Sequence, residues 1–165
     1  MTVARKAIAE AAPSGRTAAL PMDDSLFFKL VRIVNLTARP FNERVGRANR
    51  ISLNEWRVMI VLASHPASAA QEVAFHTGLD KMSVSRAIAG LARMDRIVRR
   101  DDPADKRRVL LALSARGKRV YEKIGVAGKA RETALFAAIG AAERARFART
   151  IDKLIAHHLA VDTAS

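Results

Sequence analysis

The chain has 165 residues, is 50% hydrophobic but only 5% aromatic, and carries a formal net charge of +13. This length fits one domain, or one domain with an added oligomerising part, and the composition predicts an aliphatic, mainly helical core. The absence of cysteine excludes disulfides and thiolate metal sites and is compatible with a reducing cytoplasm. No apolar run approaches the roughly 18 residues of a membrane span, so we expect no membrane segment. The charge favours a polyanionic partner, either nucleic acid or an anionic surface.

Residues 1–22 are interrupted by prolines and a glycine and have little to bury, so we expect a flexible basic arm. They lack the continuous apolar stretch of a secretory signal. A first helix is predicted over about 23–48, capped by Asp23 or Asp24. Pro40 interrupts its apolar spacing and should kink it, because proline lacks a backbone N–H.

The next predicted helix begins at Ser52, with Glu55 three residues later completing a capping box. Its side chains are apolar nearly all round, and the His65-Pro66 step should end it. A helix without a polar face belongs in the centre of a protein.

Two short helices follow, joined by a turn at Gly78. Ser68 is expected to begin the first, and Asp80 to cap the second. The second helix has one apolar stripe, and its polar side chains lie mainly on other faces. The stripe consists of Val84, Ala87, Ile88 and Leu91. This arrangement predicts a helix-turn-helix whose second helix enters the DNA major groove.

Residues 97–100 and 109–113 are short β-type runs, joined by the turn-rich segment DDPADKRR. A basic hairpin directly after a helix-turn-helix is typical of a winged helix. The window from Lys81 to Arg119 holds twelve basic and four acidic residues, and therefore eight of the thirteen net positive charges. Scattered surface charge explains this concentration less well than contact with nucleic acid does.

Ser114 should cap a long helix that continues to about Ala138, and Gly140 should separate it from a last helix. The terminal helices are more apolar than a small DNA-binding unit needs, which predicts a helical homodimer interface. A dimer would match two half-sites of a palindromic operator, roughly 34 Å apart on double-stranded DNA. The predicted fold is thus mainly α with a small β-wing, in one domain over 23–165. The winged helix-turn-helix spans about 52–113, between dimerisation helices at about 23–48 and 114–161.

Several side chains are candidates for reading DNA. Arg86 can form a forked hydrogen-bond pair with a guanine, whereas Lys81 suits a phosphate. Ser83 and Ser85 are short hydrogen-bonding side chains near the helix start, and Gln71 can donate to a phosphate.

At the hairpin tip, Lys106, Arg107 and Arg108 are placed to reach a neighbouring minor groove. Asp105 repels DNA, so its expected role is to pair with a nearby arginine and fix the direction of that guanidinium. Asp102 could assist. An ordinary charged loop is the alternative for these residues.

The order of elements and three segments, LNEWRVMIVLASHP, LDKMSVSRAIAGLARMDRIVRR and DPADKRRVLLALSARG, resemble the MarR family of bacterial transcriptional regulators. The resemblance covers about residues 24–160. It is closest where Asp105-x-Arg107 leads into Leu113-Ser114-x-x-Gly117. It implies an obligate homodimer that binds palindromic operators, usually as a repressor released by a small, often aromatic or phenolic, acid.

The resemblance also implies an effector pocket between the dimerising helices and the DNA-reading part. The candidates on this chain are Arg32, Asn35, Trp56 and His65. Trp56 could stack on an aromatic ring and Arg32 could pair with a carboxylate. The alternatives are that Trp56 belongs to the core, that Arg32 faces water, and that His65 only ends its helix.

No metal site, cofactor or catalytic activity is expected. His76, His157 and His158 lack the paired ligands that zinc requires, and no nucleophile elbow, phosphate-binding glycine loop or helical HExxH occurs. Three alternatives to a ligand-released repressor remain. They are an activator, a ligand-independent or architectural DNA-binding protein, and a ligand carrier or enzyme that never touches DNA.

Overall fold

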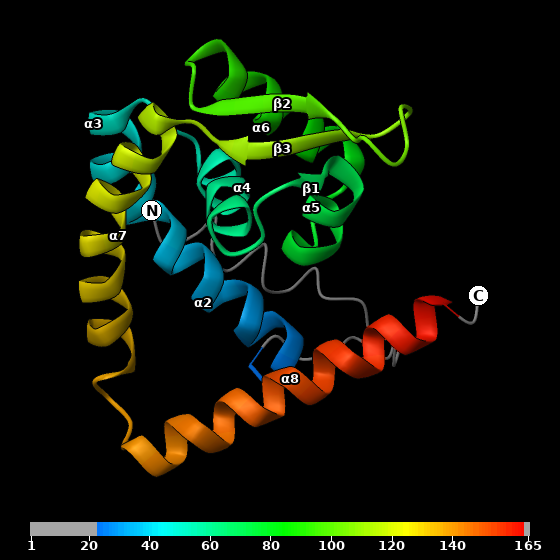
Figure 1. The fold of residues 1–165 in the computed structure, drawn as a ribbon. Coiled ribbons are helices and arrows are strands. Elements are labelled where there is room, and N and C mark those ends of the chain that lie inside the picture. The colour runs from blue at the N-terminus through cyan, green and yellow to red at the C-terminus, as the bar shows by residue number, and fades with distance from the viewer. Residues whose placement is uncertain (1–22, 164–165) are drawn as a thin grey trace, which may run out of the picture. The chain divides into compact units, whose positions relative to one another are not determined.

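The computed structural model describes residues 23–163 (Figure 1). The predicted arm over residues 1–22 lies outside this range. The chain divides after Arg44 into two compact units. None of the helices that are described is long and apolar enough to cross a membrane.

The first unit contains helix α2, Leu26–Pro40. Its N-cap is Ser25, whose hydroxyl accepts the Phe28 N–H at 3.1 Å, so the prediction of Asp23 or Asp24 as the cap was wrong by one or two residues. The regular α-helical pattern ends at Pro40, and the chain continues as a π-helical turn over Phe41–Gly46. Pro40 cannot donate a backbone hydrogen bond, so it interrupts the helix as predicted. The interruption is a change from α-helix to π-helix and not a simple kink.

The second unit is a group of helices with a small sheet (Figure 1). A short helix α3, Arg47–Asn49, precedes α4, Leu53–Ser64. The capping box at Ser52 and Glu55 is confirmed, since each side chain accepts the other residue's backbone N–H. Helices α5, Ala70–Thr77, and α6, Lys81–Arg93, form the helix-turn-helix. Helices α7, Ala115–Phe136, and α8, Ala141–Thr163, complete the chain.

Three strands form an antiparallel sheet in the order β1-β3-β2. Strands β2, Ile97–Asp101, and β3, Val109–Leu113, form the predicted hairpin, with Ile97 opposite Leu113. The hairpin loop extends past α5, whereas α7 starts at the other end of the sheet (Figure 1).

Strand β1, Ser68–Ala69, corrects the prediction that Ser68 begins a helix. Ser68 instead pairs with Leu111 of β3, and its hydroxyl donates to the His65 carbonyl at 2.8 Å. Helix α5 therefore begins at Ala70, where the Glu72 carboxylate accepts the Ala69 N–H at 2.6 Å.

The core of the second unit is aliphatic, as the composition predicts. It lies where α4, α6 and the base of the sheet meet, and α4 supplies buried residues from several of its faces. The largest fully buried side chains are Met59, Leu62, Leu91, Ile124, Val58, Val73 and Val84. This core fixes the orientation of α6 and the hairpin, whose outer surfaces carry the predicted functional residues.

Candidate nucleic-acid interface

Helix α6 separates apolar from polar side chains cleanly. Its stripe of Val84, Ala87, Ile88 and Leu91 is buried as predicted, whereas Lys81, Ser85 and Arg86 are exposed. The turn before it depends on Gly78, which ends α5 with φ +65°, a left-handed conformation that residues with a Cβ rarely adopt. Because the apolar stripe of α6 is packed in the core, the direction of its exposed side chains is fixed.

The start of α6 is stabilised by Asp80, whose carboxylate accepts the Ser83 N–H at 2.9 Å. Hydrogen bonds from the Ser83 hydroxyl and backbone lower the pKa of Asp80, and the charge of Arg86 adds to the effect. Ser83 is half-buried. Because its hydroxyl is engaged with the cap, Ser85 is the more available of the two predicted serines.

A hollow of about 470 Å³ separates α6 from the hairpin, and it brings three predicted residues together. Gln71 from α5 and Lys81 and Ser85 from α6 line its polar part. Arg99 of β2 joins them, although the sequence analysis did not single it out. The sequence signal for Arg99 is its place in the predicted β-run 97–100 of the basic window, and in the structure it pairs across the hairpin with the buried Leu111.

A second hollow of about 550 Å³ lies between α5 and the hairpin loop, with Arg107 and Arg108 in its lining. It shares Ala70, Gln71 and Val109 with the first hollow. Lys81 and Ser85 of α6 and Arg107 and Arg108 of the loop therefore line two adjoining hollows, which together we call the basic surface, and Gln71 lines both.

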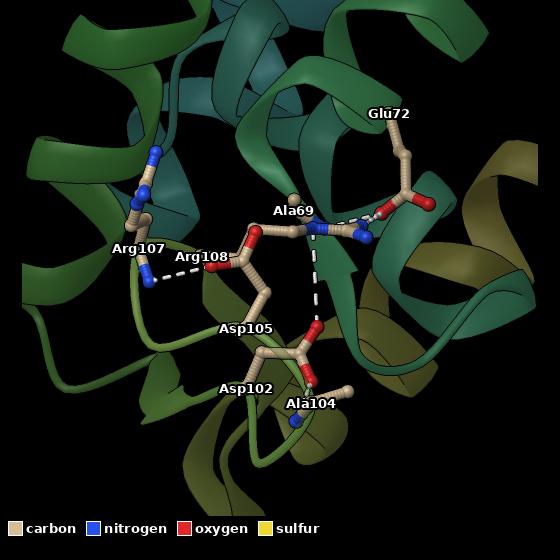
Figure 2. Close-up of polar contacts among 7 residues, drawn as sticks. All are labelled: Ala69, Glu72, Asp102, Ala104, Asp105, Arg107 and Arg108. Carbon is tan, nitrogen blue, oxygen red and sulfur yellow. Dashed lines mark hydrogen bonds and ion pairs between the residues drawn. The ribbon is translucent and has the colours of Figure 1, made fainter.

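The loop is closed by its own carboxylates and backbone (Figure 2). Asp105 accepts the Arg107 N–H at 3.0 Å, and Asp102 accepts the Ala104 N–H at 2.9 Å. The expectation that Asp105 pairs with a guanidinium is thus corrected, because its carboxylate caps the loop backbone. The ion pairs of the loop are formed instead by Asp102, which is also in the loop, and by Glu72 of α5.

Those contacts hold Arg108. Its Nη2 lies 3.3 Å from Glu72 Oε2, and its Nε lies 3.9 Å from Asp102 Oδ2. Figure 2 shows the Arg108 side chain extending toward Glu72, while the Arg107 side chain points away from it. Lys106 and Arg107 are exposed, and no ion pair of either is found among residues 23–163.

The other end of the hairpin is held by Arg96, which is only 4% exposed. Its guanidinium donates to the backbone carbonyls of Asn49 and Arg50. Burial lowers the pKa of Arg96, against the opposing effect of nearby Glu55. The Arg96 carbonyl accepts the Ser114 N–H at 3.0 Å and lies against Gly117, leaving no room there for a Cβ. Arg96 was predicted only as one charge of the basic window.

The effector candidates fall in both units. Arg32 and Asn35 are exposed on α2 in the first unit. In the second, Trp56 stacks on Tyr121 of α7 with ring centroids 5.3 Å apart, an aromatic pair of which only one member was predicted. His65 stacks on His76 at 4.4 Å, so it does more than end α4. Over residues 23–163, no cluster of three or more His, Cys, Asp or Glu offers a metal site.

A comparison with protein-family models finds a match to the central segment of the chain. Residues 51–108, which run from the start of α4 to the hairpin loop, match the model of the MarR family. A search of curated protein sequences finds no match.

Solved structures resemble the chain over most of its length. A MarR/EmrR family transcriptional regulator from Acinetobacter sp. ADP1 is 24% identical with a TM-score of 0.73, covering 87% of this chain and 99% of its own. The PcaV transcriptional regulator from Streptomyces coelicolor, solved with its natural ligand, is 23% identical with a TM-score of 0.70, covering 84% and 96%. Bordetella bronchiseptica BpsR, whose DNA binding is regulated by 6-hydroxynicotinic acid, is 22% identical with a TM-score of 0.67, covering 76% and 94%. The chain thus has the winged-helix fold of these regulators.

Proposed function

We propose that this chain is a transcriptional regulator of the MarR family, whose model matches residues 51–108, and that it binds a palindromic operator as a homodimer. We further propose that it represses transcription until an aromatic or other organic acid binds. The observation that carries the proposal is the arrangement of α6 and the hairpin. One face of α6 is fixed in the core, and the other presents Lys81, Ser85 and Arg86 beside a basic hairpin.

In this proposal different exposed residues contact the bases, the phosphates and the minor groove. Arg86 reads a guanine in the major groove, and Ser85 approaches the base edges or backbone beside it. Gln71, Lys81 and Arg99 surround one hollow and contact phosphates, which position the protein without reading sequence. Lys106 and Arg107 enter the adjacent minor groove. Ser83 contributes through the α6 cap.

A gel shift with the chain's own upstream DNA tests this function, with a scrambled palindrome as competitor. Arg86→Ala should weaken operator binding by at least about 25-fold, the value of two forked guanine contacts, one in each half-site, and leave binding to the scrambled DNA nearly unaffected. Arg93→Ala is the matched control, because Arg93 is an exposed arginine in the last turn of the same helix. Equal affinity for both DNAs would favour an architectural protein that binds by charge alone, the alternative that the basic window supports.

The dimer proposal is supported by apolar side chains that the single chain leaves in water. On α2, Leu26 and Phe27 are 76% and 77% exposed, and Leu154 and Ile155 of α8 are 52% and 53% exposed. Exposed apolar residues in such number mark an interaction surface. Sedimentation should show a dimer, which Leu154→Asp together with Ile155→Asp should dissociate. A monomeric wild type would contradict the proposal.

The effector proposal is supported by the stacked rings of Trp56 and Tyr121, against which an aromatic acid can stack. His65, in the same unit as Trp56 and Tyr121, remains a candidate for a polar contact, whereas Arg32 and Asn35 on α2 of the first unit remain predictions from the sequence alone. Because Trp56 is the only tryptophan, its fluorescence reports directly on a nearby ligand. Titration with 6-hydroxynicotinic acid and benzoic acids should change this fluorescence, raise the melting temperature and weaken operator binding. Weakened operator binding without any change of fluorescence would place the site elsewhere.

A further inference from the structure

We infer that Arg108 is a positioning residue of the hairpin, which from here on we call the wing, and not one of its DNA contacts. The inference deepens the proposed function and rests on it. Its basis is the double engagement of the Arg108 guanidinium by Glu72 and Asp102, at 3.3 and 3.9 Å. These contacts join the wing loop to the first helix of the helix-turn-helix.

Glu72 is a fixed point for this connection. The same oxygen that faces Arg108, Oε2, also accepts the Ala69 N–H and so caps the start of α5. A carboxylate that is bound to its own helix end moves with that helix. Gln71, which lies beside it, lines both hollows of the basic surface. Arg108 therefore connects the wing loop to the start of α5, next to Gln71, which lines both hollows.

Asp102 fixes the loop from the other side. Its side chain is 13% exposed, and its other oxygen accepts the Ala104 N–H. The Asp102 N–H donates to the Arg108 carbonyl at 3.0 Å, and the Arg108 N–H donates to the Asp105 carbonyl at 2.8 Å. These bonds give the loop its internal shape but do not orient it toward α5. The Glu72–Arg108 ion pair supplies that orientation.

The consequence concerns Arg107. Its side chain points away from the Glu72–Arg108 pair (Figure 2), so the direction in which it reaches depends on how the loop is held. Glu72 and Arg108 are 49% and 46% exposed, and ion pairs at such sites contribute little to folding. The pair is suited to setting the position of a loop, and it leaves Lys106 and Arg107 as the cations of that loop available to DNA.

Glu72→Gln separates the two roles by the sign of its effect. Glutamine keeps an acceptor for the Ala69 N–H, so the helix cap survives, but the variant loses the charge that holds Arg108. If Arg108 is a DNA contact, removing Glu72's negative charge frees it and strengthens DNA binding. If Arg108 positions the wing, the same change weakens operator binding. We expect about fivefold weaker binding from the two copies in a dimer.

The controls use the same chain. Glu122→Gln removes an equal charge from an exposed site on α7, whose start lies at the opposite end of the sheet from the loop. It should leave operator affinity unchanged or slightly higher. Arg108→Gln should weaken binding as much as Glu72→Gln does, and the double variant should be no weaker than either, because both changes break one connection. Equal melting temperatures would verify that the variants are folded.

The outcomes separate this inference from the proposed function. Unchanged or tighter operator binding by Glu72→Gln, with the wild type specific for its operator, overturns the role of Arg108 alone. Additive losses in the double variant overturn it as well. A pair of spin labels without DNA provides an independent readout of how the loop lies against α5, because the chain has no cysteine of its own. The distance between labels at Ala104→Cys in the loop and Phe75→Cys on α5, both exposed positions, should become longer or more broadly distributed in Glu72→Gln even if the wild type proves not to discriminate its operator. An unchanged distance distribution contradicts the inference.

Discussion

At its base, the β2–β3 hairpin is joined to the helices by a buried arginine and a tightly packed glycine, whereas at its tip it is joined by exposed ion pairs. Arg96 is 4% exposed and its carbonyl packs on Gly117, while Arg108 and Glu72 are each nearly half exposed. Burial makes the base costly to change, because a buried polar group that loses its partner keeps its desolvation penalty. At the tip, water replaces a lost partner. The base should therefore control folding, and the tip should control binding.

Gly117→Ala should have the largest effect on stability. A Cβ at this position overlaps the Arg96 carbonyl oxygen, which is backbone and cannot rotate away. We expect a loss of about 3 kcal/mol in the free energy of unfolding, measured by denaturant titration at fixed protein concentration. Gly125→Ala on the same helix is the control. Nothing lies within 4 Å of its Cβ position, so it should stabilise α7 by up to about 1 kcal/mol.

Arg96→Met should come next. Methionine fills much of the same space but leaves the carbonyls of Asn49 and Arg50 without this donor, which should cost about 2 kcal/mol. Arg99→Met removes an exposed arginine three residues further along, in β2, and should leave the unfolding free energy nearly unchanged. If the two variants had equal unfolding free energies, the stability of the hairpin base would not depend on the burial of Arg96. The contrast between base and tip would then fail.

The same contrast explains what could be predicted from the sequence. The caps at Ser52, Asp80 and Ser114 were identified because each bonds a backbone N–H three residues away. The apolar stripe of α6 was identified for the same reason, since its spacing is local. The match of the sequence to a winged helix followed from the order of such local features.

Partners distant in the sequence could not be identified this way. Ser68 was assigned to a helix because its strand partner, Leu111, belongs to another part of the chain. Asp105 was assigned to a guanidinium because it is the nearest acid, whereas Arg108 is held by Glu72 on α5. Arg96 looks like any arginine of the basic window until the fold buries it. Long-range pairings of this kind decide which charges remain available to DNA.

Arg107→Ala tests the other half of the comparison. The side chain is exposed, so its removal should leave the melting temperature unchanged. If it contacts DNA in both subunits, the slope of log K against log salt should fall by about 2. Gel shifts or fluorescence anisotropy over a salt series measure this slope. An unchanged slope would mean that the tip lies off the DNA, and the assignment of binding to the tip would be lost.

Asp80→Asn should have the smallest effect, and it refines the comparison with an intermediate case. Asp80 is exposed, like Glu72 and Arg108 at the tip, but it caps a helix whose other face is in the core. Asparagine caps as well as aspartate, so only the charge is lost. Because hydrogen bonds from Ser83 lower the pKa of Asp80 below the ordinary aspartate value of 3.8, the ionised form stabilises the fold above that pH. Its contribution is lost as the pH falls through the lowered pKa.

Wild type should therefore melt slightly above Asp80→Asn at pH 7, and the two melting temperatures should converge below about pH 4. A difference that persists in acid would mean that Asp80 acts through geometry, as Arg96 does, and not through charge.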